Sequence, residues 1–142
     1  MNMAKLKLNA GIDKISASKL KAVKKKKVSP KAISGTWVNC DRKTRGLVRV
    51  VLGSRGGTLM VQVFGACTPT PCDWGVVKGL AYSDSVSSTE AVAFSATYKF
   101  GFKTTIVTGH LEKGCMVIET YNHFTDSSGR CDYYSRECFC RH

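Results

Sequence analysis

The alternation of apolar and polar residues after Ile33 constrains the fold more than any other feature of this sequence. Short runs with a period of two are separated by Gly, Asp, Ser and Pro about every 8 to 15 residues. In the clearest run, one face would hold Val92, Phe94, Ala96, Tyr98 and Phe100, and the other Ala93, Ser95, Thr97 and Lys99. A period of two belongs to a β-strand with one buried face, because successive side chains of a strand point to opposite sides. The pattern therefore predicts an all-β domain.

Eight such runs are predicted to be strands. They span residues 36–39, 47–52, 59–66, 74–82, 91–100, 103–111, 115–124 and 132–141. The connections are too short for crossover helices, so consecutive strands must pair antiparallel in an up-and-down meander. A meander of this length closes into a barrel or folds into a two-layer sandwich, and closure leaves no exposed sheet edge. We therefore expect a closed barrel of about eight strands.

A lysine-rich segment precedes the alternating region. Residues 1–34 contain ten lysines and a single acid, so they hold nine of the chain's twelve net positive charges. Like charges repel over Lys24–Lys27, and Pro30 disfavours helix at the residue before it, so this stretch is interpreted as an extended linker. We therefore divide the chain into a flexible tail over residues 1–32 and the barrel over residues 33–142.

The composition of the tail indicates which partner it would bind. It contains no arginine and no aromatic residue, which favours contact with phosphate groups over the reading of bases. Nucleic acid is the first expected partner, an anionic membrane surface ranks second, and a solubilising segment without a partner is the alternative. The residues expected to contact a polyanion are Lys19, Lys21, Lys24, Lys25, Lys26 and Lys27.

The seven cysteines are an odd number, so complete pairing would leave one thiol over. No apolar run with the length of a secretory signal follows the first lysines, and no stretch approaches the roughly 18 apolar residues that span a bilayer. We therefore expect an intracellular protein whose thiols are mostly reduced.

The first and last predicted strands share a further pattern. Gly35-Thr36-Trp37 opens the first strand, and Arg136 and Arg141 lie on the last. This resembles the signature of the calycins, the superfamily of lipocalins, fatty-acid-binding proteins and avidins. The resemblance implies that a basic residue of the last strand covers the indole of Trp37 and plugs one end of the barrel. Either arginine is a candidate, because the last strand of a closed, even-numbered meander ends beside the start of the first.

A stiff loop with two prolines separates the third and fourth predicted strands. Cys67 and Cys72 flank it at hairpin spacing, so the first interpretation is a structural turn with two thiols near disulfide distance. The loop would also make a recognition edge at a barrel mouth, with Trp74 as an anchor and Asp73 as a hydrogen-bond acceptor. Both interpretations stay open.

Two polar turns each combine an aspartate with an arginine. One runs from Asp41 to Arg45 and the other from Asp126 to Arg130. An aspartate in such a turn most often caps backbone N–H groups of the turn itself. In a closed eight-stranded meander both turns lie at the end opposite Trp37. They are therefore also candidates for binding a polar ligand.

The sequence lacks the motifs of the common enzyme classes, such as a nucleophile elbow, a phosphate loop or His-Glu-x-x-His. Cys138, Cys140 and His142 alternate along a strand, about 6.6 Å apart, and would not meet at one metal ion. We expect a non-enzymatic binding module without cofactor or metal, which holds a small molecule or a protein edge at one barrel end. The alternative is a nucleic-acid-associated protein whose tail contacts the phosphate backbone.

Overall fold

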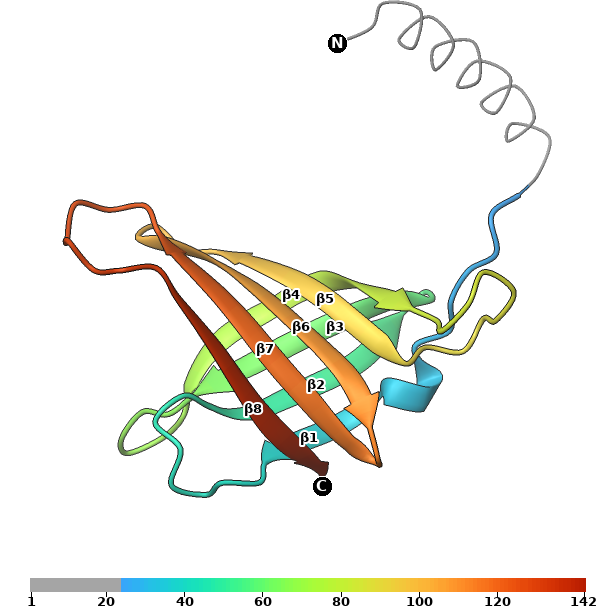
Figure 1. Ribbon diagram of the computed structural model, residues 1–142, viewed down its shortest axis with the longest axis horizontal. Coiled ribbons are helices and arrows are strands. Elements are labelled where there is room, and N and C mark those ends of the chain that lie inside the picture. Colours follow the sequence, from blue (N-terminus) through green and yellow to red (C-terminus); the bar gives the residue numbers. More distant parts are fainter. Residues whose placement is uncertain (1–23) are drawn as a thin grey trace, which may run out of the picture.

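The alternating runs form eight β-strands in a computed structural model that describes residues 24–142 (Figure 1). The strands are β1 (Gly35–Asn39), β2 (Leu47–Arg55), β3 (Thr58–Gly65), β4 (Cys72–Tyr82), β5 (Ala93–Lys99), β6 (Lys103–Glu112), β7 (Cys115–Phe124) and β8 (Tyr133–Arg141). Each strand pairs antiparallel with the next, and β8 pairs with β1. The predicted all-β, up-and-down closed barrel is confirmed.

Two of the hairpins are closed by tight turns that fix the strand register. Gly56 and Gly57 link β2 to β3 with φ values of 58° and 79°, and Lys113 and Gly114 link β6 to β7 with φ values of 51° and 82°. Positive φ at both central residues is typical of the turn whose twist matches a β-hairpin. Because the register sets which side chains point inward, these turns help to define the barrel interior.

Large apolar side chains fill the half of the interior near the start of β1. Trp37, Phe94 and Phe139 are at most 1% exposed. A 3-10 helix, η1 (Lys31–Ile33), lies across this end, and the side chain of Ile33 is fully buried in the core. The Trp37 indole N–H donates a hydrogen bond to the Ile33 carbonyl at 2.9 Å. The helix therefore plugs the barrel at this end.

Arg141 is the basic residue of the last strand that covers the indole. Its guanidinium carbon lies 4.3 Å from the centroid of the Trp37 ring. The register explains the choice, because Trp37 and Arg141 are paired across β1 and β8. The other candidate, Arg136, lies 3.8 Å from Glu112 in a half-exposed ion pair.

The connections between strands gather at two opposite ends of the barrel (Figure 1). The closed end, with Trp37 and η1, holds the β2–β3, β4–β5 and β6–β7 connections. The open end holds the β1–β2, β3–β4, β5–β6 and β7–β8 connections. The expected placement of both Asp/Arg turns at one end, opposite Trp37, is therefore confirmed, and the proline loop lies at the same end.

Part of the segment predicted as linker lies against the closed end. The Ser29 N–H donates to the Thr89 carbonyl at 2.7 Å, and the Ser29 carbonyl accepts from the Ala91 N–H at 3.1 Å. Val28 is partly buried against the core. These contacts extend the packed region of the chain back to Val28.

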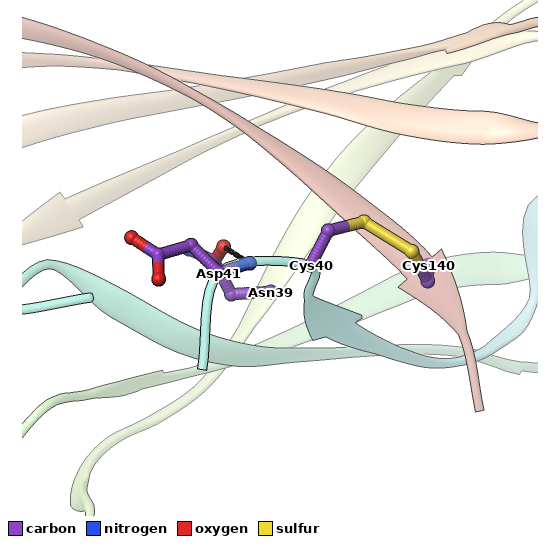
Figure 2. The surroundings of a disulfide bond; sticks show 4 residues. All are labelled: Asn39, Cys40, Asp41 and Cys140. Carbon is purple, nitrogen blue, oxygen red and sulfur yellow. Dashed lines mark hydrogen bonds between the residues drawn. A yellow bond between two sulfur atoms is a disulfide. The ribbon is translucent and has the colours of Figure 1, made fainter. Parts of the chain in front are cut away.

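The seam between β8 and β1 is short and is reinforced by a disulfide. Three residue pairs join the two strands. Cys40, directly after β1, is bonded to Cys140 near the end of β8, with the two Cα atoms 5.6 Å apart (Figure 2). A second disulfide joins Cys67 to Cys72 across the β3–β4 loop, as the hairpin spacing of these two residues suggested.

The expectation of mostly reduced thiols is therefore wrong, because four of the seven cysteines form disulfides. Cys115, Cys131 and Cys138 are free. Cys40 and Cys140 are 100 residues apart in sequence, and only the barrel closure brings them together. Within residues 24–142, no three His, Cys, Asp or Glu side chains gather as a metal ion would require. In the same range no helix has the length and hydropathy needed to cross a membrane.

The strands β4 and β5 pair only along part of their length. Their register runs from Gly79 with Ala96 to Tyr82 with Ala93. Nearer the open end the two strands do not pair. There the buried Tyr98 side chain of β5 reaches β4, and its hydroxyl donates to the Gly75 carbonyl at 2.8 Å. A side-chain contact thus replaces backbone pairing in this part of the wall.

Candidate functional site

A cavity of about 250 Å³ lies at the open end of the barrel. Its walls come from the β1–β2 and β3–β4 loops and from the ends of β7 and β8 next to their connection. The Cys67–Cys72 disulfide and the Trp74 side chain form part of one wall. The polar side chains that line the cavity are Arg45, Thr120, Asn122, Tyr133, Ser135 and Glu137.

The cavity lies where the inward faces of three neighbouring strands change from apolar to polar. Toward the closed end these strands present Val107 on β6, Met116 and Ile118 on β7, and Phe139 on β8, all buried. Toward the open end they present Lys103 and Thr105, Thr120 and Asn122, and Ser135 and Glu137. Inward and outward side chains thus keep alternating along each strand, while the inward ones change from apolar to polar along the barrel axis.

Asn122 is the centre of a buried hydrogen-bond network. Its carbonyl oxygen accepts from the Lys103 ammonium at 3.1 Å and from the Thr105 hydroxyl at 2.9 Å. Its amide nitrogen donates to the Thr120 hydroxyl at 3.0 Å. Thr120 in turn shares a short hydrogen bond with Ser135 on β8. The network links β6 to the ends of β7 and β8 that line the cavity, and holds them in one arrangement.

Glu137 places a carboxylate in the cavity. One of its oxygens accepts a 2.6 Å hydrogen bond from the Thr44 hydroxyl and a further bond from the Asn39 amide. The other oxygen lies against Gly46, where a Cβ atom would collide with it. Among the described residues Glu137 forms no ion pair. Its charge is thus held by neutral donors only.

Asn39 anchors this arrangement to the end of β1. Its amide nitrogen also donates to the Leu47 carbonyl at 2.8 Å, and its side-chain oxygen accepts from the Asp41 N–H at 2.8 Å (Figure 2). Asn39 is 5% exposed. It therefore connects the β1–β2 loop to the carboxylate of Glu137.

Aromatic rings surround the Lys103 ammonium beside the cavity. Lys103 is 8% exposed, and its nitrogen lies 5.0 Å from the centroid of Trp74 and 5.6 Å from that of Phe100. The rings of Phe102 and Phe124 are each 6.0 Å away. Burial lowers the pKa of Lys103, and the charge of the nearby Arg130 lowers it further. Interactions with the rings offset part of the lost hydration.

Arg130 lies at the outer rim of this cluster. Its guanidinium carbon is 4.4 Å from the centroid of Phe124 and 5.2 Å from that of Phe102. It also donates to the Asp126 carboxylate at 2.9 Å. Hydrogen bonds from the Ser128 hydroxyl, and then the Arg130 guanidinium, lower the pKa of Asp126. The β7–β8 turn is thus a self-contained, charge-paired unit.

The structure divides the residues predicted to bind a ligand into two groups. Arg45, Cys67, Cys72 and Trp74 line the cavity. The other four, Asp41, Asp73, Asp126 and Arg130, do not. The two lysines of the predicted polyanion set that precede residue 24, Lys19 and Lys21, lie outside the described residues.

The aspartates outside the cavity are occupied locally. Asp41 accepts from the Lys43 N–H at 3.0 Å, the turn-capping role that is usual for this residue type. Asp73 is exposed and accepts from the Gln62 amide and from the Gly75 N–H. The backbone bond from Gly75, followed by that from Gln62, lowers the pKa of Asp73. Asp73 therefore shapes the bend of β4 and does not face the cavity.

Sequence reasoning missed the polar residues inside the barrel. Those that line or support the cavity are Asn39, Thr44, Lys103, Thr105, Thr120, Asn122, Ser135 and Glu137. A signal was present, because six of them occupy positions of strands β6 to β8 that continue an apolar inward face. A polar residue at such a position is expected to be buried and hydrogen-bonded.

Comparison of the chain with models of known families, with curated proteins and with solved structures finds no match in any of the three. The functional interpretation therefore depends on the geometry of the barrel alone.

Proposed function

We propose that this protein is a calycin-like binding module whose open end holds a small polar molecule. The observation that supports it is the change in the barrel interior from a packed apolar half to a polar half around a cavity of about 250 Å³. Burying polar groups costs free energy unless each finds a partner, whereas apolar side chains carry no such cost. A barrel with a purely structural role would therefore be expected to fill this half with apolar side chains too. Concave sites with a few convergent polar groups are the usual form of small-molecule sites.

The residues around the cavity indicate the chemistry of the ligand. The Glu137 carboxylate accepts hydrogen bonds, so the ligand would offer an O–H or N–H donor to it. The Trp74 indole, near the start of β4, provides a flat apolar surface. The volume is slightly below the usual range of about 300–1,000 Å³ for ligand pockets. The ligand would therefore be a small, partly flat molecule with hydroxyl or amino groups.

Binding without catalysis is the proposed activity. The hydroxyl of Ser135 is bonded to another hydroxyl, that of Thr120, and no general base adjoins it among the described residues. Asn122 uses both atoms of its amide within the protein. Such groups position and recognise a ligand, whereas a nucleophile needs a base within hydrogen-bond reach.

A fragment screen on the full chain tests the proposal. Small polyols, amino alcohols and hydroxylated aromatic compounds would be added, and the melting temperature would be measured. A ligand at one hundred times its Kd stabilises the folded state by about 2.7 kcal/mol, which raises the melting temperature by several degrees. Native mass spectrometry would look for a molecule that copurifies with the chain.

Matched variants locate the binding site. Glu137→Gln removes the carboxylate in the cavity, whereas Glu119→Gln removes one on the outer face of β7 that accepts from the Tyr134 hydroxyl. We expect Glu137→Gln to weaken binding of the hits at least tenfold and Glu119→Gln to leave it unchanged. The proposal fails if no compound binds and none copurifies, or if the two variants behave alike.

A further inference from the structure

A groove lies near the other end of the barrel, between the lysine run and the outer surface of β3 and β4. Its volume is about 620 Å³, and Lys24–Val28 form one side while Leu80 to Ser83 form much of the floor. The run is held in place where it meets the barrel. The Lys27 ammonium donates to the Gly56 carbonyl at 3.4 Å, and the neighbouring Ser29 bonds to the β4–β5 loop.

The charge of the groove is entirely positive. Lys24, Lys25, Lys26 and Lys27 are exposed, and none of them pairs with a carboxylate of the described residues. No aspartate or glutamate is among the described residues that line the groove. Four unpaired ammonium groups along one side of a recess attract a ligand with several negative charges at regular spacing.

The floor of the groove is apolar and aromatic. Leu80 is 64% exposed and Tyr82 is 44% exposed, and both side chains lie on the outer face of β4. The Tyr82 hydroxyl is bonded to the Ser95 hydroxyl at 2.8 Å, which restricts the orientation of the ring. An exposed ring of fixed orientation beside a row of cations matches the two requirements of single-stranded nucleic acid, a stacking surface for a base and charges for the backbone.

We propose that this groove binds a single strand of nucleic acid, with its phosphates along Lys24–Lys27 and a base stacked on Tyr82. A duplex keeps its bases stacked on one another, so its phosphates would contact the lysines but no base would stack on Tyr82. An anionic membrane would meet the lysines but not a ring at the floor of a recess. The aromatic floor therefore favours the single strand. The site is separate from the cavity at the open end, and neither proposal requires the other.

Fluorescence anisotropy of the full chain with a labelled oligothymidine of about twelve nucleotides tests the site. Lys24, Lys25, Lys26 and Lys27 would be replaced together by Gln. The matched control replaces Lys5, Lys7, Lys14 and Lys43 by Gln, which removes the same charge from other parts of the chain. We expect the affinity of the first variant to fall at least tenfold further than that of the second. Its salt dependence should also weaken, by about 0.7 in log–log slope for each phosphate that the lysines no longer neutralise.

Tyr82→Ser tests the stacking surface, with Tyr134→Ser as the control because Tyr134 is a 51% exposed tyrosine on β8. We expect Tyr82→Ser to weaken binding about five- to tenfold without changing the salt slope, and Tyr82→Phe to bind like the unchanged chain. Equal losses in the two lysine variants, or no loss in Tyr82→Ser, would overturn the proposal. So would binding to phosphatidylserine vesicles, or to the duplex, that is at least as tight as binding to the single strand.

Discussion

The guanidinium of Arg141 lies over the indole of Trp37, with its carbon 4.3 Å from the ring centroid, at the closed end of the barrel. The same guanidinium donates to the Ser34 carbonyl at 2.7 Å and to the Ala32 carbonyl at 2.9 Å. Ser34 precedes β1, and Arg141 is the last residue of β8. One side chain therefore joins the last strand to the segment that leads into the first strand, over the indole.

Replacing Arg141 by Met should lower the free energy of unfolding by about 1–3 kcal/mol, because it removes a cation–π interaction and two hydrogen bonds. Arg136→Met is the matched control, since Arg136 has a half-exposed partner, Glu112, at 3.8 Å. That change should stay within about 0.5 kcal/mol. Urea denaturation of both variants measures the difference, and equal losses of stability would contradict the role given to Arg141.

The two disulfides should differ in their effect on stability. Cys40 and Cys140 are separated by 100 residues and Cys67 and Cys72 by 5. In the chain-entropy account, removal of the long-range disulfide costs about 4.7 kcal/mol and removal of the local one about 2 kcal/mol. Double Cys→Ser variants compared by urea denaturation measure both values. A larger loss from the local disulfide would refute the expectation.

A single substitution at Cys140 would give an ambiguous result. The register of the seam continues so that Cys40 lies opposite the free Cys138, and the Cys40 N–H donates to the Cys138 carbonyl at 3.0 Å. Cys138 could then pair with Cys40 in place of Cys140. Mass-spectrometric mapping of the Cys140→Ser protein should detect this alternative disulfide. The double variants avoid it.

The fold followed from the sequence because the signals that determine it are local. Period-two runs define strands, and the short connections leave no topology other than a meander. The residue pairs across the seam between β8 and β1 could not be predicted in this way, because they depend on the register of these two strands. Sequence reasoning could place both Arg136 and Arg141 on the last strand, but only the pairing of Trp37 with Arg141 selects between them.

The candidate site was predicted less completely, because it depends on contacts between strands distant in sequence. Trp74 and the Cys67–Cys72 loop were found from their unusual local composition. Glu137 was not, since its partners Asn39 and Thr44 are 98 and 93 residues away. Asp73, also predicted to bind a ligand, does not line the cavity, and its carboxylate accepts from the Gly75 N–H. A sequence pattern does not display such a local backbone partner.

The Tyr98 hydroxyl should stabilise the part of the wall where β4 and β5 do not pair. It donates to the Gly75 carbonyl at 2.8 Å and lies 3.1 Å from the Val61 carbonyl. Tyr98→Phe leaves these carbonyls without that donor and should cost about 1–2 kcal/mol. Tyr121→Phe, at a position 45% exposed on the outer face of β7, is the control and should change stability little. Urea denaturation of the two variants measures the difference.

Tyr98 also predicts an alkaline limit to stability. Burial raises its pKa from 10.0 to about 12, so the folded state keeps the proton that the unfolded state has begun to lose. Its contribution is complete below pH 10 and is lost as the pH rises toward 12. Ultraviolet absorbance of tyrosinate in Tyr98→Phe and in the unchanged chain would follow this titration. The same alkaline unfolding curve in both proteins would rule out Tyr98 as its source.

Lys103 should destabilise the folded state at neutral pH in spite of its aromatic surroundings. Its pKa is lowered from 10.5, chiefly by burial, so the folded state binds the proton less tightly than the unfolded state. The favourable contribution of this group is therefore present above pH 10.5 and is lost as the pH falls through the folded-state pKa. Lys103→Met keeps an unbranched side chain that is one atom shorter and uncharged, and Asn122 keeps the Thr105 hydroxyl as a donor.

We therefore expect Lys103→Met to be at least as stable as the unchanged chain at pH 7, with the difference shrinking as the pH approaches 10. Lys99→Met, at an exposed position on the adjacent strand β5, is the control for loss of one positive charge. Urea midpoints of the three proteins across this pH range provide the measurement. If Lys103→Met is the least stable at pH 7, the attraction of the four rings exceeds the cost of burial. Lys103 would then stabilise the open end of the barrel through its charge.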